Sequence, residues 1–171
     1  EDHDRHLWIC TDGGLHRWIN GQWHRYDLED RTRSRNANWA YNMYEDKSGR
    51  LWVATCLGGV LVVNKKKLEA SKSYCIADYS FDMSNGLAGM FVNQLAPDAK
   101  GHLWILLYNC GLQRINMRTM RVQNINLKKY TGAHNPSYIL SDSQCHVWVG
   151  LRGGVLYLGD GDTPPRNPTH T

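Results

Sequence analysis

A short apolar segment with a tryptophan at its centre recurs four times along the chain. Each copy has an aliphatic residue on both sides of the tryptophan, as in Leu51-Trp52-Val53. The four tryptophans are Trp8, Trp52, Trp104 and Trp148, and successive ones lie 44, 52 and 44 residues apart. A short apolar run is typical of a buried β-strand, and its recurrence at this period predicts a repeat architecture.

Polar and small residues surround each tryptophan at constant positions. An aspartate stands six residues before each one, at Asp2, Asp46, Asp98 and Asp142. A small pair follows each, at Gly13-Gly14, Gly58-Gly59, Cys110-Gly111 and Gly153-Gly154, and an aliphatic residue comes next. Asp46 with Gly49 predicts a hairpin turn, because the carboxylate can accept backbone N–H groups and glycine can adopt a positive φ. The small pair predicts a second turn into another strand.

The remaining apolar segments complete a unit of four strands. One segment precedes each aspartate, over residues 39–44, 91–95 and 138–140, and further strands follow the small pair, as at 59–63 and 22–26. Four short antiparallel strands in about 44 residues match a β-propeller blade. We therefore expect an all-β fold: a partial β-propeller over residues 1–162, with repeat units at about 1–30, 38–82, 90–128 and 136–158.

The repeat count predicts an incomplete propeller. The chain is expected to begin before the second strand of one blade and to end after about the third strand of another, which gives about three and a half blades. Propellers close with four to eight blades. We therefore expect either the remaining blades of a larger propeller or a second protomer as partner. The second unit is longer around residues 65–74, where an extended loop is expected, and the proline-rich tail 163–171 is expected to be disordered.

Composition removes several function classes. The 171 residues carry a net charge of +4, and the basic residues fall in two short clusters, at 31–35 and 65–67, rather than in a stripe, so no nucleic-acid partner is expected. No apolar stretch reaches the ~18 residues of a membrane span. The five cysteines form no C-x-x-C pair, which indicates neither a disulfide framework nor a zinc site. Most are expected to be buried as small apolar residues.

Residues 46–55 (Asp-Lys-Ser-Gly-Arg-Leu-Trp-Val-Ala-Thr), followed by Gly58-Gly59-Val60, resemble the two-component regulator propeller repeat, as do residues 85–87 with 98–105. The family pattern is Asp, two residues, Gly, one residue, Leu-Trp-Ile-Gly-Thr, then Gly-Gly-Leu. The resemblance covers nearly the whole chain except the tail. Arg5 and Cys145 replace the turn glycine, and Leu106-Leu107 replace Gly-Thr, so the departures concern local turns.

The resemblance implies a location and a role. Such propellers are typically periplasmic sensor halves of hybrid two-component systems, whose parent protein is anchored in the membrane and carries a histidine kinase. Their ligands are commonly oligosaccharides. The expected function is therefore carbohydrate sensing and signal transduction to a kinase that is not present in this chain.

Metal and catalytic sites are not expected. His6, His102 and His146 each lie two residues before a repeat tryptophan, and such a position repeats with the fold, so they indicate polar strand starts rather than metal ligands. No Gly-x-Ser-x-Gly motif is present. We expect no catalytic residue, no metal and no cofactor. The repeated aspartates are also expected to be structural, and loss of Asp46 to cost about 1 kcal/mol of stability.

The expected ligand face is built by the loops between blades and by the turns between second and third strands. Sugar binding needs a flat apolar platform with fixed polar groups. The residues that supply these types on that face are Arg35, Asn38, Trp39, Asn93, Tyr108, Asn109 and Arg152. Trp39 and Asn93 could instead fill the core or the central channel. Two alternatives stay open: a protein–protein interaction scaffold, and a propeller lyase or hydrolase.

Overall fold

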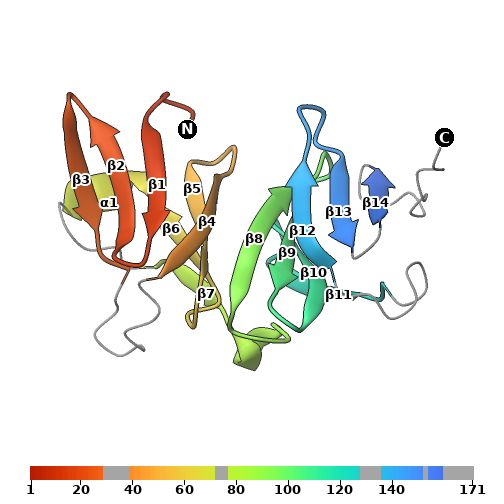
Figure 1. Cartoon of the computed structure of the whole chain (residues 1–171). Helices are drawn as coiled ribbons and strands as arrows, with labels where there is room; N and C mark the ends of the chain where they lie inside the picture. Colours follow the sequence, from red (N-terminus) through yellow and green to blue (C-terminus); the bar gives the residue numbers. More distant parts are fainter. Residues whose placement is uncertain (29–38, 72–76, 128–135, 152–153, 160–171) are drawn as a thin grey trace. The chain divides into compact units, whose positions relative to one another are not determined.

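The computed structural model describes residues 1–28, 39–71, 77–127, 136–151 and 154–159 (Figure 1). These residues form four antiparallel sheets, and the chain divides into two compact units, Glu1–Asn93 and Gln94–Thr171. No helix in the described part of the chain is long and apolar enough to span a membrane.

The first unit contains two sheets. The first sheet has the order β1 (Leu7–Thr11), β2 (Gly14–Ile19), β3 (Gln22–Tyr26), and the second has the order β4 (Ala40–Glu45), β5 (Arg50–Thr55), β6 (Val60–Asn64), β7 (Tyr79–Phe81). A short 3-10 helix, η2 (Met83–Asn85), follows β7.

Two sheets also follow along the rest of the chain. The third has the order β8 (Val92–Pro97), β9 (His102–Leu107), β10 (Gly111–Asn116), β11 (Arg121–Ile125), and the fourth has the order β12 (Pro136–Ser141), β13 (Val147–Leu151), β14 (Gly154–Gly159). Sheets of three or four antiparallel strands, with the repeat tryptophans on β1, β5, β9 and β13, confirm the all-β propeller-blade prediction. The repeat boundaries stay predictions, and the tail 163–171 lies outside the described residues.

The insertion in the second repeat, which belongs to the first compact unit, forms a helix and not the extended loop that the sequence predicts. Residues Lys65–Ser71 form the helix α1 between β6 and β7. The side chain of Asn64 accepts hydrogen bonds from the backbone N–H groups of Lys66 and Lys67, at 3.0 and 3.3 Å, which satisfies donors at the helix start. Leu68 is buried in the core of this unit. A local cap and one buried leucine thus account for the helix.

Each repeat aspartate holds its own tryptophan. In the second sheet, Oδ1 of Asp46 accepts the backbone N–H groups of Ser48 and Arg50, while Oδ2 accepts the indole N–H of Trp52 at 2.9 Å. The same indole bond joins Asp2 to Trp8, Asp98 to Trp104 and Asp142 to Trp148, at 2.9, 2.9 and 3.1 Å. The aspartate therefore closes the hairpin and also pairs the buried indole, a bond that the sequence analysis did not predict.

The turn conformation survives where the glycine is replaced. Gly49 and Gly101 have φ of 72° and 83°, and Arg5 and Cys145 adopt φ of 63° and 60° at the equivalent positions. The predicted architecture therefore tolerates the two departures from the repeat pattern, at the energetic cost of a left-handed non-glycine residue.

The cysteines are less buried than predicted. Of the four that the structure describes, Cys56 is buried, Cys10 and Cys145 are half-buried and Cys110 is exposed. Cys110 and Cys145 take turn positions that glycine holds in other repeats, which places them at the surface. Burial raises the pKa of the Cys10 thiol to about 12.

Each compact unit has a hydrophobic core among its described residues, in which one sheet packs on the opposite face of the next. We call the face that carries the repeat tryptophan the tryptophan face, and the face that carries its two neighbours the aliphatic face, because successive side chains point to opposite sides of a strand. In the first unit, Trp8 and Leu15 pack against Leu51 and Val53. In the second unit, the tryptophan face of the third sheet packs in the same way on the aliphatic face of the fourth.

Candidate functional site

A groove of about 540 Å³ runs between β1 and β4 in the first unit. It combines aromatic rings with amide and carboxyl groups, the composition that a polar, flat ligand such as a sugar requires. Its lining residues are Glu1, His3, Trp8, Ile9, Cys10, Tyr41, Asn42, Met43, Tyr44 and Glu45.

The buried Lys65 contacts three carboxyl groups, of which that of Glu45 lines the groove. Nζ of Lys65 lies 2.7 Å from Oε1 of Glu45, 2.6 Å from Oδ2 of Asp4 and 3.4 Å from Oδ2 of Asp2. Oε2 of Glu45 also accepts the backbone N–H of His3 at 2.7 Å. Burial opposes the charged ammonium, but the bonds to Asp4 and Glu45 hold the pKa of Lys65 above its usual value. These carboxylates are therefore fixed ion-pair partners.

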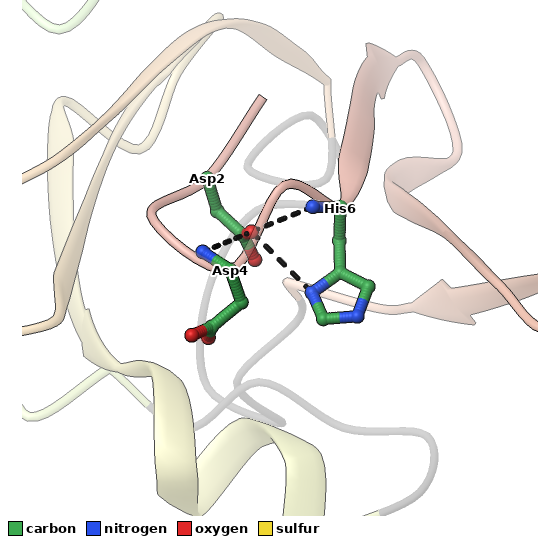
Figure 2. Close-up of side chains that lie close together, drawn as sticks. All are labelled: Asp2, Asp4 and His6. Carbon is green, nitrogen blue, oxygen red and sulfur yellow. Dashed lines mark hydrogen bonds and ion pairs between the residues drawn. The ribbon is translucent and has the colours of Figure 1, made fainter.

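Asp2, Asp4 and His6 lie close enough together to be considered as a metal site (Figure 2). Their ligand atoms are already engaged. Oδ1 of Asp2 accepts the backbone N–H groups of Asp4 and His6, and a guanidinium nitrogen of Arg17 lies 2.7 Å from Nδ1 of His6. Lys65 also lies beside the carboxylates of Asp2 and Asp4. The lysine and Arg17 therefore occupy the ligand atoms that a metal ion would have to bind. The group supports the local fold and gives no reason to expect a metal.

The residue two positions before each tryptophan contacts the repeat aspartate. Nδ1 of His102 and His146 lies 3.0 and 3.2 Å from Oδ2 of Asp98 and Asp142, and Nε of Arg50 donates to Oδ2 of Asp46 at 2.7 Å. The side chain at the predicted strand start thus contacts the repeat aspartate in one repeat after another. A role that repeats in this way around the fold is structural.

Exposed aromatic side chains gather where β4 begins. Trp39 and Tyr41 are both exposed, and Tyr41 packs against Phe91 with ring centroids 5.2 Å apart. The backbone carbonyl of Trp39 accepts the N–H of Cys56 at 2.9 Å, which fixes it beside the turn between β5 and β6. Burial, together with the neighbouring Cys56 thiol, raises the pKa of the Tyr41 hydroxyl. An anchored aromatic platform therefore lies at one end of the second sheet.

The predicted ligand residues fall in different places. Arg35, Asn38 and Arg152 lie outside the described residues. In the first unit, Trp39 is exposed and Asn93 is half-buried in β8; in the second unit, Tyr108 and Asn109 are both exposed in the turn between β9 and β10. The structure places Tyr108 and Asn109, which are consecutive in the chain, in one exposed turn, and the assignment of all seven residues to ligand binding stays a prediction.

Tyr41, Asn42 and Tyr44 line the groove, although the sequence did not single them out. The apolar pattern predicts a strand over all three residues but does not show which edge or face of that strand stays open. Their pattern of polar and aromatic residues on one short strand was the available signal.

Comparisons with known proteins agree with the fold. A sequence model of the family described as the two component regulator propeller matches residues 34–56. The extracellular domain of a hybrid two component system from B. thetaiotaomicron is 39% identical, with a TM-score of 0.88, over 100% of this chain and 24% of that chain. The search of curated proteins found no match.

Two more distant structures share the fold alone. A second such extracellular domain from B. thetaiotaomicron is 18% identical, with a TM-score of 0.71, over 99% of this chain and 24% of its own. A gluconolactonase from Xanthomonas campestris is 15% identical, with a TM-score of 0.59, over 98% of this chain and 60% of its own.

The chain spans about a quarter of the length of the extracellular domains that it matches. Their extracellular origin agrees with the periplasmic location that the sequence resemblance implies. Residues 34–56 therefore match the two component regulator propeller repeat, and the chain as a whole is similar to part of the extracellular domain of a hybrid two component system.

Proposed function

We propose that this chain is a ligand-sensing part of an extracytoplasmic two-component propeller, and that its ligand is an oligosaccharide. The observation that carries the proposal is its 39% identity, along its whole length, to the extracellular domain of a hybrid two component system. In the parent protein, which we propose to be membrane-anchored, binding would be passed to a histidine kinase outside this chain.

The described surface supports this ligand class. Trp39 and Tyr41 offer an anchored aromatic platform, and Tyr108 and Asn109 place a ring and an amide in one exposed turn. Sugar rings stack on aromatic faces through their C–H groups, while amides fix the hydroxyls. The groove between β1 and β4 adds Tyr44 to these surfaces.

Sensing requires that the ligand favour one arrangement of the protein over another. A ligand that binds both arrangements equally shifts neither, however tightly it binds. We propose that the ligand bridges loops of more than one blade, because only such a contact distinguishes two arrangements of rigid sheets.

A catalytic role has less support. General acid–base catalysis needs a carboxyl group whose proton can be exchanged with the substrate. Glu45 and Asp2 instead pair with Lys65, and hydrogen bonds lower the pKa of Asp2. The gluconolactonase shares the fold at 15% identity, which carries no activity to this chain. We therefore propose a binding protein rather than an enzyme.

Calorimetric titration with neutral and acidic oligosaccharides tests the proposal. Trp39→Ala is expected to weaken binding to the first unit at least tenfold, and Tyr108→Ala tests the exposed turn of the second unit separately. Trp23→Ala is the matched control, since Trp23 is equally exposed but lies on β3. Loss of binding in the control alone would contradict the assigned site. An absence of binding to every glycan, with retained capture of a protein partner, would favour an interaction scaffold.

A further inference from the structure

The ring nitrogen Nδ1 of His6 has the opposite hydrogen-bond role to Nδ1 of the two other histidines at this repeat position. Nδ1 of His102 and of His146 faces a carboxylate oxygen, which can only accept, so these nitrogens donate. Nδ1 of His6 lies 2.7 Å from Nη2 of Arg17, and a guanidinium can only donate. In the first repeat, therefore, the same nitrogen accepts.

The bond between His6 and Arg17 exists only while Nδ1 carries no proton. The ring proton then lies on Nε2, and the lone pair of Nδ1 faces the guanidinium. Histidine is the side chain that ordinarily changes its charge between pH 5 and pH 8. A proton taken up at Nδ1 removes this lone pair and places two cations where a hydrogen bond was.

A protonated His6 has a second partner within reach. Oδ1 of Asp2 lies 3.4 Å from the same ring nitrogen (Figure 2), and the Asp2 side chain is fully buried. An ion pair with a buried carboxylate is only weakly screened by water and salt. Nδ1 therefore has two alternative partners: the guanidinium of Arg17 when it is unprotonated, and the carboxylate of Asp2 when it is protonated.

The charged side chains around His6 come from four segments of the first unit, and we call them the ionic cluster. Its members are Asp2 and Asp4 from the N-terminal segment, Arg17 from β2, Glu45 from β4, and Lys65 and Glu69 from α1. His3 lies at its edge, 3.6 Å from Glu45. Four carboxylates thus face two permanent cations, so a protonated imidazole leaves the cluster without an excess of positive charge.

Arg17 joins the first sheet to α1. Its Nη1 lies 2.6 Å from Oε1 of Glu69, and its side chain is only 5% exposed. Nε of Arg17 has no acceptor among the described residues, so the bonds to Glu69 and His6 fix the orientation of the guanidinium. Because the group is planar and rigid, Nη2 cannot move away from a protonated imidazole without moving Nη1 away from Glu69.

The start of α1 is held by other contacts. Lys65 pairs with Asp4 and Glu45, and Leu68 is buried in the core of the unit. Neither contact involves His6 or Arg17. Loss of the pair between Arg17 and Glu69 should therefore loosen the last turn of the helix and leave the unit folded.

We propose that His6 is a proton-controlled switch that sets how firmly α1 is held against the first sheet. With His6 unprotonated, Nδ1 accepts from Arg17, which pairs with Glu69. With His6 protonated, Nδ1 donates to Asp2, and Arg17 leaves its position beside Glu69. The switch does not depend on the ligand proposed above.

Amide hydrogen exchange of the full chain at pH 7.5 and pH 5.5 tests the proposal. We expect the protection factors of the α1 amides, which are corrected for the intrinsic pH dependence of exchange, to fall about tenfold at the lower pH. Loss of one hydrogen bond to a charged group has an effect of about this size. Nitrogen NMR of the histidine rings over the same pH range shows when Nδ1 of His6 becomes protonated.

His6→Asn separates the switch from other effects of pH. The amide oxygen of asparagine can accept from Arg17 as Nδ1 does, but it takes up no proton in this range, so α1 should be equally protected at both pH values. His24→Asn is the matched control, because His24 is exposed and lies opposite Arg17 in the register of β2 and β3. This variant should keep the response of the wild-type chain.

Three results would overturn the proposal. One is a response in His6→Asn equal to that of the wild-type chain, and another is a loss of the response in His24→Asn. The third is a wild-type chain in which Nδ1 of His6 stays unprotonated, or becomes protonated while the protection of α1 stays constant. If circular dichroism shows that His6→Asn is unfolded, the wild-type chain decides alone: protection of α1 must fall with the same midpoint as the protonation of Nδ1.

Discussion

The indole nitrogen of Trp52 lies 2.9 Å from Oδ2 of Asp46, six residues earlier in the chain, and both side chains are buried. The same carboxylate closes the hairpin through Ser48 and Arg50. The Asp46 side chain therefore accepts hydrogen bonds both from backbone N–H groups of the turn and from the buried indole N–H of the strand that follows. The recurrence of this pair in all four sheets explains why the aspartate and tryptophan repeat together.

Replacement of Asp46 by alanine is expected to destabilise the fold by about 3 kcal/mol. A buried indole N–H without an acceptor costs about 1–3 kcal/mol, and loss of the turn bonds adds about 1 kcal/mol. This exceeds the cost expected from the turn alone. Urea denaturation measures it. Asp142→Ala is the matched variant, with a smaller expected loss because Asp142 and Trp148 are only half-buried; equal losses in the two variants would contradict the role of the buried indole.

Gly59 is expected to tolerate no side chain. A Cβ there would lie 2.0 Å from the backbone oxygen of Phe81, at a φ of +70°. Gly101 has a similar φ of +83°, but nothing lies within 4 Å of its added Cβ. Gly101→Ala should therefore cost about 1 kcal/mol and Gly59→Ala several times more. Thermal denaturation of both variants checks this, and comparable melting temperatures would show that the backbone of Phe81 can move away.

Lys65→Met is expected to cost about 3 kcal/mol, because it leaves the buried Glu45 without its lysine partner and leaves Asp2 with Arg17, at 3.6 Å, as its nearby guanidinium. Lys66→Met is the control, since Lys66 is exposed on the same helix. Chemical denaturation of both variants gives the difference. A loss in Lys65→Met no larger than in the control would mean that water replaces the ammonium at no cost.

Acid is expected to destabilise the first unit between about pH 4 and pH 2. Burial alone would raise the pKa of Asp2, but the bonds from Trp8 and His6 and the nearby Lys65 lower it to about 2, below its model-compound value of 3.8. Below about pH 4, the Asp2 carboxyl therefore binds a proton in the unfolded chain while it stays ionised in the folded chain. Its contribution to stability is fully present above the unfolded pKa and is lost as the pH falls through the folded pKa.

Melting temperatures measured from pH 6 to pH 2 check this window. In Lys65→Met the loss of stability that comes from Asp2 should be smaller, because the pKa of Asp2 in the folded chain rises towards its unfolded value when the ammonium is gone. A melting temperature that stays constant from pH 4 to pH 2 would contradict the assigned charge state of Asp2.

Local sequence patterns predicted the strands and turns, but not the contacts between residues that are far apart in the chain. The aspartate, the tryptophan and the small pair define strands and turns over short distances, so β4, β5 and β6 follow from the sequence. Lys65 meets Asp2 across 63 residues, a contact that needs the packed unit. The helix α1 depends on a cap at Asn64 and on the burial of Leu68, and neither stands out in a lysine-rich segment.

The candidate site was less predictable than the fold. Trp39 and Tyr108 were chosen by residue type and loop position, and both are exposed. Tyr41 and Tyr44 line a groove only because β1 and β4 come together in space. Neighbouring sheets pack with a tryptophan face against an aliphatic face, and this packing decides which strands face each other. The pattern within one repeat does not show which face packs on which.

We propose that this propeller segment binds an oligosaccharide without converting it. The proposal is tested by a thermal-shift screen of the whole chain against neutral and acidic oligosaccharides, with the recovered glycans checked for products. Ligand at 100 times its dissociation constant should stabilise the fold by about 2.7 kcal/mol. We expect a raised melting temperature with one class of glycan and no product. Unchanged melting temperatures with every glycan, or release of a product, would overturn the proposal.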